Sequence, residues 1–600
     1  MEQWSAAERA EFLGRATVTA DLDERTREAL AGRLTPVTLA SGEYLMHQGE
    51  VGDAMFFVIT GRLRVVLEGD EPHIIGRIGA GAIVGELALL ADEPRFASVI
   101  AARDTDLLRL AREDFEEIIG VAPGLLRAVA STVVRRLGER GRAAPVPDRT
   151  IAVVAAGSAG DPRLLDDFVR SLRQTLLRYG PTTVIGPDDI AAAADQAELS
   201  RRLASDEERN AFVVLVGAGD GIAWTLRHAD VVLLVANADD QPGQGAAQQH
   251  LPELRANPIT APQVYLALQH PRDRNLLHTT QGWLEASGAD GVFHLRLQSG
   301  EVDRIARHIA GRAVGLALGG GGARGFAHLG VLRALEEARV PIDVIGGTSI
   351  GALVAAFFAM GWDADEREAR AVEALVGNGA LFGVTLPVLS LSSAAKVHRL
   401  LTDERFLGER NIEDLWTTFC CISADLGRAE PVVHDRGSLA LAVRASISLP
   451  GILPPVAEDG RWLIDGGVLD NLPTETIRER TNGGPLIAVD IRPQIDLSMT
   501  PSFGTSVSGW SLVGQRLSRR GEQAPLPSLV DVFMRASGLG SIRAQQESLQ
   551  RVPADLLLRP PVGTHRILDF RHGPNLVRSA YEYTVDALEG APRSLWGEVG

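Results

Sequence analysis

A serine between two glycines, in Gly347-Thr348-Ser349-Ile350-Gly351, constrains the fold of this chain more than any other stretch. An apolar run precedes it, and an apolar run of helical character follows it. Glycine has no Cβ atom, so the two flanking positions permit a sharp turn from a strand into a helix. Ser349 is then expected at a helix N-terminus, where the helix dipole favours a developing negative charge. A serine that only caps a helix is the alternative.

Two glycine-rich stretches elsewhere bear on this choice. The first, Gly319-Gly320-Gly321-Gly322, also follows a short apolar run. Successive glycines let neighbouring backbone N–H groups converge on one anion, such as a tetrahedral oxyanion. A phosphate-binding loop is the competing interpretation, but no Lys-Ser or Lys-Thr pair follows these glycines. The second stretch is Asp465-Gly466-Gly467, which on its own is most simply a turn.

In this order, the three stretches resemble the motifs of the patatin-like phospholipase family. Ala445-Ser446-Ile447-Ser448-Leu449-Pro450 adds to the resemblance, which covers about Ala313 to Pro493. It implies a carboxylic ester hydrolase of phospholipid or lysophospholipid that works through an acyl-serine and requires no metal or other cofactor. Ser349 would be the nucleophile and Asp465 the general base of a dyad. The other implied site residues are the oxyanion donors Gly320, Gly321 and Gly322, the bracing Arg324, the nucleophile-elbow glycines Gly347 and Gly351, and Gly466 and Gly467 of the aspartate motif.

A Ser-His-Asp hydrolase is the competing enzyme. In that class with this serine motif, the histidine follows the acid in the chain. Only His565 and His572 follow Asp465, and neither lies in a stretch typical of a loop after a core strand. His328, just after the glycine loop, is expected to be structural. The sequence therefore favours the dyad.

Composition limits the other possibilities. The 600 residues are enough for three or four domains. Cys420 and Cys421 are adjacent in an apolar run, which predicts buried thiols of an intracellular protein instead of disulfides. The N-terminus lacks a signal-peptide pattern, and no apolar run reaches the roughly 20 residues that span a bilayer. We expect a cytoplasmic protein that contacts membranes at most peripherally. The formal net charge of −17 argues against a nucleic-acid partner.

The segment from Ala380 to Leu391 is apolar but interrupted by glycine and proline. A long helix is therefore not expected there. The segment either lines the acyl pocket or touches a membrane, or it is a buried connector.

Short strands with period-two patterning, separated by glycine turns, run from about Leu22 to Gly120 and predict a small β-barrel. The pattern places separate strands at Ala54–Ile59 and Leu63–Leu67, with a turn at Gly61. The stretch from Gly85 to Ser98 resembles the phosphate-binding cassette of cyclic nucleotide-binding domains. An inherited roll that binds nothing is the alternative.

This resemblance implies a regulatory ligand. Backbone N–H groups behind Gly85 and the Arg95 guanidinium would hold a cyclic phosphate, and Glu86 would accept a hydrogen bond from the ribose. Phe96 stands where guanine-selective members carry a hydroxyl, which favours cAMP over cGMP, while Ser98 partly restores a hydroxyl nearby. The implied nucleotide-binding residues are Gly85, Glu86, Leu87, Ala88, Arg95, Ala97 and Ser98.

Helical sequence from Arg112 to about Arg142 would carry a ligand signal onward or join two copies of the chain, and residues 141–148 are typical of a linker. From Thr150 to Arg312, apolar β-branched runs alternate with helices, which predicts a parallel, Rossmann-like α/β domain with a scaffold or coupling role. This order of parts resembles bacterial members of the neuropathy target esterase family.

We therefore expect a multidomain α/β protein. A nucleotide-binding β-roll with flanking helices would occupy 1–142 and an α/β domain 149–312. A patatin-like α/β/α hydrolase core would occupy 313–493, with an extension packed on it at 494–600. The nucleotide is expected to regulate the hydrolase. The alternative is a nucleotide sensor with a vestigial esterase site, whose output is a protein interaction.

Overall fold

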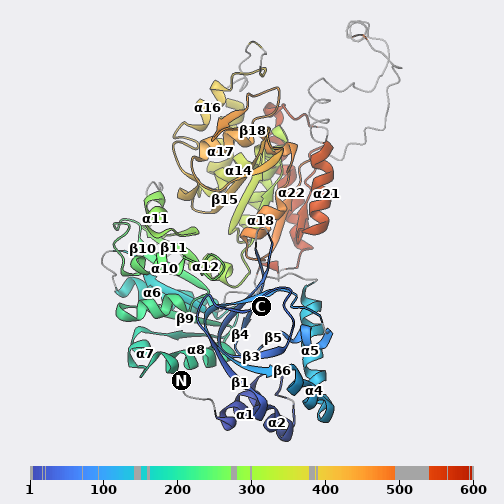
Figure 1. The fold of residues 1–600 in the computed structure, drawn as a ribbon. Helices are drawn as coiled ribbons and strands as arrows, with labels where there is room; N and C mark the ends of the chain where they lie inside the picture. Colours follow the sequence, from blue (N-terminus) through green and yellow to red (C-terminus); the bar gives the residue numbers. More distant parts are fainter. Residues whose placement is uncertain are drawn as a thin grey trace. The chain divides into compact units, whose positions relative to one another are not determined.

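The computed structural model describes residues 5–140, 150–157, 162–271, 280–296, 301–377, 386–492, 508, 539–592 and 595–596, without positions 17, 21, 70, 71, 92, 387, 388 and 564. The predicted linker at 141–148 and most of the apolar segment at 380–391 lie outside these residues. The chain divides into two compact units. The first contains the N-terminal part up to Ala313 together with residues 481–484, and the second starts at Val314. Figure 1 labels the elements of both units.

An antiparallel β-roll with flanking helices forms the first part of the first unit, drawn in blue in Figure 1. Its strands have the order β1-β6-β3-β4, with β2 paired to β6 and β5 paired to β3. Buried side chains such as Met55, Phe57 and Leu108 fill its core. The elements are α1 (Ala6–Arg15), α2 (Glu24–Arg33), β1 (Thr35–Leu39), β2 (Tyr44–Met46), β3 (Ala54–Leu67), β4 (His73–Gly79), β5 (Ile83–Val84), α3 (Glu86–Ala91), β6 (Ser98–Ala111), α4 (Arg112–Val121) and α5 (Pro123–Arg140).

One long strand replaces two predicted ones. Strand β3 runs unbroken from Ala54 to Leu67, so the predicted turn at Gly61 is wrong. Gly61 instead has a φ of 92° where the pairing of β3 with β6 shifts register around Thr60 and Arg62. Such a bulge bends a strand without ending it.

A parallel sheet forms the second part of the first unit, which we call the middle domain. Its strand order is β12-β11-β10-β7-β9-β8. Ile151, Ala152, Val153 and Val154 on β7 are all fully buried, because helices cover both faces of a parallel sheet. The elements are β7 (Thr150–Ala155), α6 (Pro162–Leu176), β8 (Thr182–Ile185), α7 (Pro187–Ala192), α8 (Gln196–Arg209), β9 (Phe212–Gly217), α9 (Ile222–Arg227), β10 (Val231–Asn237), α10 (Leu251–Leu254), β11 (Gln263–His270), α11 (Thr280–Ser287), β12 (Gly291–Arg296) and α12 (Val302–Ile309).

An eight-stranded mixed sheet organises the second unit. Its order is β17-β18-β15-β14-β13-β19-β20, with β16 also paired to β15. The pairs that join β15, β14, β13, β19 and β20 are parallel, and the pairs that involve β16, β17 and β18 are antiparallel. The elements are β13 (Gly315–Leu318), α13 (Phe326–Glu337), β14 (Val344–Thr348), α14 (Ile350–Ala359), α15 (Ala364–Val372), α16 (Ala395–Leu401), β15 (Thr418–Asp425), β16 (Glu430–His434), α17 (Leu439–Ser446), β17 (Val456–Glu458), β18 (Arg461–Asp465), α18 (Thr474–Arg480), β19 (Leu486–Val489), α21 (Leu539–Arg551), β20 (Leu556–Leu558) and α22 (Asn575–Glu589).

Helix α14 is the central helix of this unit. Almost all of its side chains are buried and apolar, which is typical of a helix enclosed by a protein core. The C-terminal residues complete the same unit, because β20 pairs with β19 and α22 packs against α13. The junction between β14 and α14, where Ser349 lies, is therefore held on a rigid scaffold.

Among the described helices, none by itself combines the length and the hydropathy needed to cross a bilayer, and α4 and α5 do so only as a pair bent by 116°.

Candidate active site and nucleotide pocket

Ser349 occupies a strained turn between β14 and α14. Its φ is 58° and its ψ is −125°, a conformation that L-residues rarely adopt and that is often found at functional sites. A methyl group added to Gly347 would lie 2.5 Å from the carbonyl carbon of Gly351, and one added to Gly351 would lie 2.3 Å from the Leu318 carbonyl oxygen. Both flanking positions therefore require glycine, as the sequence pattern indicated.

Asp465 ends β18 directly beside this serine. The Ser349 hydroxyl donates to Asp465 Oδ2 at 2.6 Å, and the Gly467 N–H donates to Asp465 Oδ1 at 2.8 Å. Both side chains are buried. Burial raises the pKa of Asp465 to about 6, although the hydrogen bonds from Ser349 and Gly467 act in the opposite direction. A carboxylate with this pKa is suited to accept a proton near neutral pH.

The glycine loop lies against the same serine. A methyl group added to Gly320 would be 3.1 Å from the Ser349 Cβ atom. The Gly320 N–H is already engaged, because it donates to the Asn471 carbonyl oxygen at 3.1 Å. Within the described part of the chain, the N–H groups of Gly321 and Gly322 have no acceptor. These two N–H groups are therefore available for a further hydrogen bond.

Side chains on both sides brace the glycine loop. Arg324 donates through Nε to the His565 carbonyl oxygen at 2.8 Å, and the Ala323 N–H donates to the Ile567 carbonyl oxygen at 2.8 Å. His328 is fully buried, and its Nε2 lies 2.8 Å from the Gly319 carbonyl oxygen. Burial lowers the pKa of His328 to about 4, so the ring is neutral at pH 7 and its Nε2 serves as the donor.

The two histidines that follow Asp465 in sequence have other partners. His565 Nε2 lies 2.9 Å from the Asp569 carbonyl oxygen, and His572 Nδ1 lies 2.9 Å from the Asp569 carboxylate. The serine hydroxyl contacts Asp465 directly instead. This geometry does not match a Ser-His-Asp triad.

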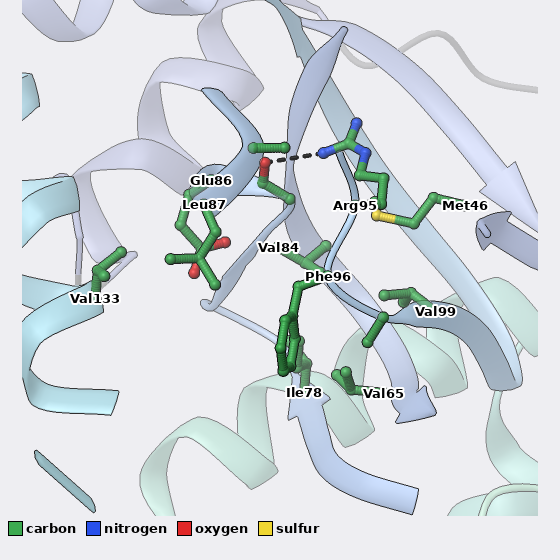
Figure 2. A pocket seen from close by; sticks show the side chains of 13 residues that line it. Met46, Val65, Ile78, Val84, Glu86, Leu87, Arg95, Phe96, Val99 and Val133 are labelled. Carbon is green, nitrogen blue, oxygen red and sulfur yellow. Dashed lines mark hydrogen bonds between the residues drawn. The ribbon is translucent and has the colours of Figure 1, made fainter. Parts of the chain in front are cut away.

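A pocket lies in the β-roll, and Figure 2 shows the side chains around it. Apolar groups from β2, β3 and β6 line one side, and the cassette after β5 lines another, with Val133 contributed by α5. Gly85, Glu86, Leu87, Ala88, Arg95 and Ala97, all predicted nucleotide-binding residues, line this pocket.

Arg95 is held firmly at the pocket wall. Its guanidinium donates to the carbonyl oxygens of Gly85 at 2.9 Å and Ala54 at 2.8 Å, the first of which is drawn in Figure 2. Burial lowers the pKa of Arg95, and the carboxylates of Asp53 and Glu50 oppose that shift. A buried guanidinium fixed in this way is suited to neutralise a phosphate.

Ser98 does not line the pocket with the other cassette residues. Its hydroxyl accepts the Gln48 N–H at 2.8 Å and donates to the Glu68 carboxylate. The nucleotide-binding role predicted for Ser98 stays a prediction, and in this structure the roll uses the Ser98 hydroxyl to join its own strands. Phe96 lines the pocket and remains half exposed.

Two known families match the parts of the chain that contain these sites. The patatin-like phospholipase family matches residues 316–477, and the cyclic nucleotide-binding domain family matches residues 36–120. An uncharacterized NTE family protein of Mycobacterium tuberculosis is 33% identical over 568 residues, which cover 92% of this chain and 92% of that protein. This chain belongs to the NTE family. It is a hydrolase of the patatin-like phospholipase type that also carries a cyclic nucleotide-binding domain.

NTE family relatives in eukaryotes are longer. Lysophospholipase nte1 of Aspergillus oryzae is 28% identical over 92% of this chain and 41% of its own length. Human patatin-like phospholipase domain-containing protein 6 is 28% identical over 90% of this chain and 44% of its own length. A solved structure, the regulatory domain of Toxoplasma gondii PKA with cAMP, aligns with 22% of this chain at 27% identity and a TM-score of 0.20.

This NTE family site also contains residues to which sequence reasoning gave no role. Ser446 Oγ accepts the Ser349 N–H at 2.9 Å, and the Ser448 carbonyl oxygen accepts the Asp465 N–H at 2.9 Å. Asn471 accepts the Gly320 N–H through its carbonyl oxygen, and its side chain donates back to the Gly320 carbonyl at 3.4 Å. The sequence shows only that Asn471 lies shortly after Asp465. The structural role of such a polar loop residue depends on its contacts and is not visible in one sequence.

Proposed function

We propose that this chain hydrolyses carboxylic ester bonds of phospholipids or lysophospholipids through a dyad of Ser349 and Asp465. The observation that carries the proposal is the buried hydrogen bond of 2.6 Å between the Ser349 hydroxyl and the Asp465 carboxylate. The neighbouring glycine loop supplies donors, and the names of the nte1 relatives indicate the substrate class.

The reaction follows from these positions. Asp465 takes the proton of the Ser349 hydroxyl as Oγ attacks the ester carbonyl carbon, and the N–H groups of Gly321 and Gly322 stabilise the oxyanion. Protonated Asp465 then gives its proton to the leaving alcohol oxygen as the ester bond breaks, which leaves an acyl-Ser349. Asp465 then takes a proton from water as the water oxygen attacks the acyl carbon. The bond between that carbon and Ser349 Oγ breaks as Asp465 returns the proton to Oγ, which releases the fatty acid and restores the serine. Gly320, whose N–H is engaged, keeps the loop in place.

Substitution of the two dyad residues tests this proposal. Ser349→Ala and Asp465→Asn are each expected to lower kcat for a short p-nitrophenyl ester and for lysophosphatidylcholine by at least about a thousandfold. The control is Ser131→Ala, which changes an exposed serine of α5. If either dyad variant keeps its activity and a native circular dichroism spectrum, the dyad is wrong.

We further propose that cAMP occupies the roll pocket and regulates the hydrolase. Arg95 would pair with the cyclic phosphate, and Glu86 would accept a hydrogen bond from the ribose. The support is the convergence of six predicted residues on one pocket, together with the cyclic nucleotide-binding domain match. Calorimetric titration of the full chain with cAMP and with cGMP tests this, and no heat with either ligand contradicts the proposal.

We also propose a peripheral contact with lipid through Leu386, Leu389 and Leu391, which are 80%, 63% and 50% exposed. The Leu391 N–H donates to the Gly451 carbonyl oxygen at 2.9 Å, and the loop at 448–454 that contains Gly451 also contacts Asp465 through Ser448. Leu391, the last of these exposed leucines, is therefore attached to a loop that also contacts Asp465. A substrate held in a bilayer needs such an apolar entry surface.

Changing all three leucines to serine is expected to lower hydrolysis of phosphatidylcholine vesicles roughly tenfold, because partial burial of each leucine in lipid is lost. Turnover of a short soluble ester should stay unchanged. Val121→Ser is the control, since Val121 is an exposed apolar residue of the roll. An equal loss on both substrates would contradict the membrane contact.

A further inference from the structure

Three arginines on the outer face of the β-roll are buried against the middle domain, within the first unit. Arg62 and Arg64 lie on β3 and Arg103 lies on β6, and they are 5%, 6% and 4% exposed. Arginine is almost never fully buried unless it is paired. Here the partners come from the middle domain.

Two carboxylates of the middle domain, Glu207 and Asp230, form ion pairs with Arg62 and Arg103. Arg103 Nη2 lies 2.7 Å from both oxygens of Glu207 on α8, and Arg62 Nη2 lies 3.1 Å from Glu207 and 3.3 Å from Asp230. Burial opposes ionisation of Glu207, but the charges of Arg103 and Arg62 outweigh it and lower its pKa. Burial likewise opposes ionisation of Asp230, but the positive charges of Arg62 and Arg103 outweigh it and lower the pKa of Asp230. Two positive and two negative charges thus form one buried cluster.

Hydrogen bonds extend the contact beyond the cluster. Arg64 donates to the carbonyl oxygens of Ile259 and Ala261, and Arg103 donates to the carbonyl oxygen of His228. On the middle-domain side, the Thr150 N–H donates to Asp230 at 3.2 Å and the Thr150 hydroxyl donates to Glu207. The contact therefore connects two strands of the roll to three separate segments of the middle domain, at Glu207, at residues 228–230 and at residues 259–261.

The same two strands line the nucleotide pocket on their inner face. Val65 on β3 and Val99 on β6 are pocket residues. Successive side chains of a strand point to opposite faces, so Val65 faces the pocket while its neighbour Arg64 faces the middle domain. A shift of β3 caused by a ligand would move both groups together.

We propose that the middle domain is the docking partner of the nucleotide-binding roll, fixed by the cluster of Arg62, Arg103, Glu207 and Asp230, so that movement of β3 and β6 passes directly to α8. The interface itself is independent of the ligand. Its use in signalling rests on the proposed binding of cAMP. The middle domain is then the first relay of the sensor.

Hydrogen–deuterium exchange of the full chain tests the interface. Glu207→Gln leaves two buried guanidinium groups short of a counter-charge, a strongly destabilising change, so deuterium uptake in α8 and β6 is expected to rise by about tenfold or more. Arg33→Met is the control, because among the described residues the ion pairs of Arg33 are with Asp114 and Glu117 of α4, away from the middle domain. Equal uptake in both variants would overturn the proposal.

A second variant covers the case in which Glu207→Gln does not fold. Arg64→Met keeps the carboxylates paired and should raise uptake only around residues 257–264. Unchanged uptake there overturns the proposal.

The same exchange measurement with added cAMP tests the signalling role separately from the interface. Saturating cAMP should change uptake in both β6 and α8 of the wild-type protein, and neither should change in Arg95→Ala. A change confined to the roll overturns the relay, whereas no cAMP binding at all overturns the proposed ligand and leaves the interface result standing.

A separate observation concerns catalysis. Ser446 is fully buried at the end of α17, where its Oγ accepts the Ser349 N–H and donates to the Ile422 carbonyl oxygen at 2.6 Å. Two residues later, Ser448 binds the Asp465 N–H through its carbonyl oxygen. One short segment therefore contacts both members of the dyad.

We infer that Ser446 is a positioning residue, which fixes the distance between the Ser349 hydroxyl and Asp465. This inference rests on the proposed dyad. A misplacement of about 1 Å lowers turnover about a hundredfold, so Ser446→Ala should lower kcat about ten- to a hundredfold with KM nearly unchanged. A weaker hydrogen bond from Ser349 would also raise the pKa of Asp465 further, and the acid limb of the kcat/KM profile should move to higher pH.

Steady-state kinetics of Ser446→Ala, Ser446→Thr and Ser131→Ala test the inference. The threonine variant keeps the hydroxyl and should lose less than the alanine variant, and the Ser131 variant, which changes an exposed serine of α5, should match the wild type. Wild-type kcat and an unmoved acid limb in Ser446→Ala would overturn the positioning role, whereas activity in Ser349→Ala would overturn the dyad itself.

Discussion

The two sites proposed for this chain would bind negative charge in different ways. In the roll pocket, the buried Arg95 guanidinium, which also lies 3.6 Å from the exposed Asp53 carboxylate, would offer a positive charge. In the hydrolase site, the glycine loop would offer the neutral N–H groups of Gly321 and Gly322, and Arg324 directs its Nε to a backbone carbonyl instead. A cyclic phosphate is charged before it binds, whereas an oxyanion exists only during the reaction.

This difference has a physical basis in the base of the dyad. A cation close to Asp465 would lower its pKa and make it a poorer proton acceptor. Burial raises that pKa to about 6, opposed only by two hydrogen bonds. Neutral donors stabilise the oxyanion without weakening the base, so a site for a transient charge is better built from backbone N–H groups. A site for a permanent charge has no such constraint.

Among the substitutions that test this comparison, Gly322→Ala is expected to lower kcat the most. Gly322 has a φ of 57°, and an added methyl group would lie 2.2 Å from the Ile567 carbonyl oxygen, so the loop must move. Losing one oxyanion donor lowers kcat by about a hundred- to a thousandfold, and we expect a loss in this range. Gly540→Ala, where the methyl group meets nothing within 4 Å, is the control for kinetics on a short ester. Similar kcat values in the two variants would remove the loop from catalysis.

The catalytic site was largely predictable because backbone geometry determines its residue types. Gly347 and Gly351 must be glycine where other backbone atoms approach closely, and such a requirement leaves a visible pattern in one sequence. The donors within the loop were less predictable. The engagement of the Gly320 N–H by Asn471 depends on a contact between residues far apart in the chain.

The roll was predictable in its pocket and in most of its strands, but not in the continuity of β3 or in its outer face. Arg62 and Arg64 alternate with Leu63 and Val65, as solvent-facing residues of a sheet do. Only contacts with the middle domain, such as those of Arg62 with Glu207 and Asp230, show that these arginines are buried. The partner of the Ser98 hydroxyl was not predictable either, since Glu68 lies 30 residues away in the chain.

The second expected effect is on the affinity for cAMP, whose phosphate carries a permanent charge. Arg95→Met should weaken cAMP binding by about ten- to a hundredfold, because a hydrogen bond to a charged group contributes about 1.5–3 kcal/mol. Calorimetry of the full chain measures this, with Arg33→Met as a control that keeps the pocket intact. Unchanged affinity in Arg95→Met would break the comparison, because the roll would then also hold its ligand with neutral donors alone.

The third effect is the response of the two sites to pH. The folded-state pKa of Asp465 is raised, so the base is lost on acidification at about pH 6 instead of near 4. We expect kcat/KM for a neutral ester to fall about tenfold for each pH unit below that value. Affinity for cAMP should change little between pH 5 and 8, since an arginine stays protonated there. An acid limb near pH 4 in a folded enzyme would contradict the role of Asp465 burial.

The smallest effect decides whether Arg324 acts through its charge or through its hydrogen bond. Its Nε donates to the His565 carbonyl oxygen, and a lysine cannot reproduce that planar donor. One hydrogen bond contributes about 0.5–1.5 kcal/mol, so Arg324→Met and Arg324→Lys should lower kcat alike, by roughly two- to twelvefold. If the cation stabilised the oxyanion as Arg95 is proposed to stabilise a phosphate, the lysine variant would stay near the wild type while the methionine variant fell. That outcome would mean that both sites rely on a fixed cation, and the raised pKa of Asp465 would then need a different explanation.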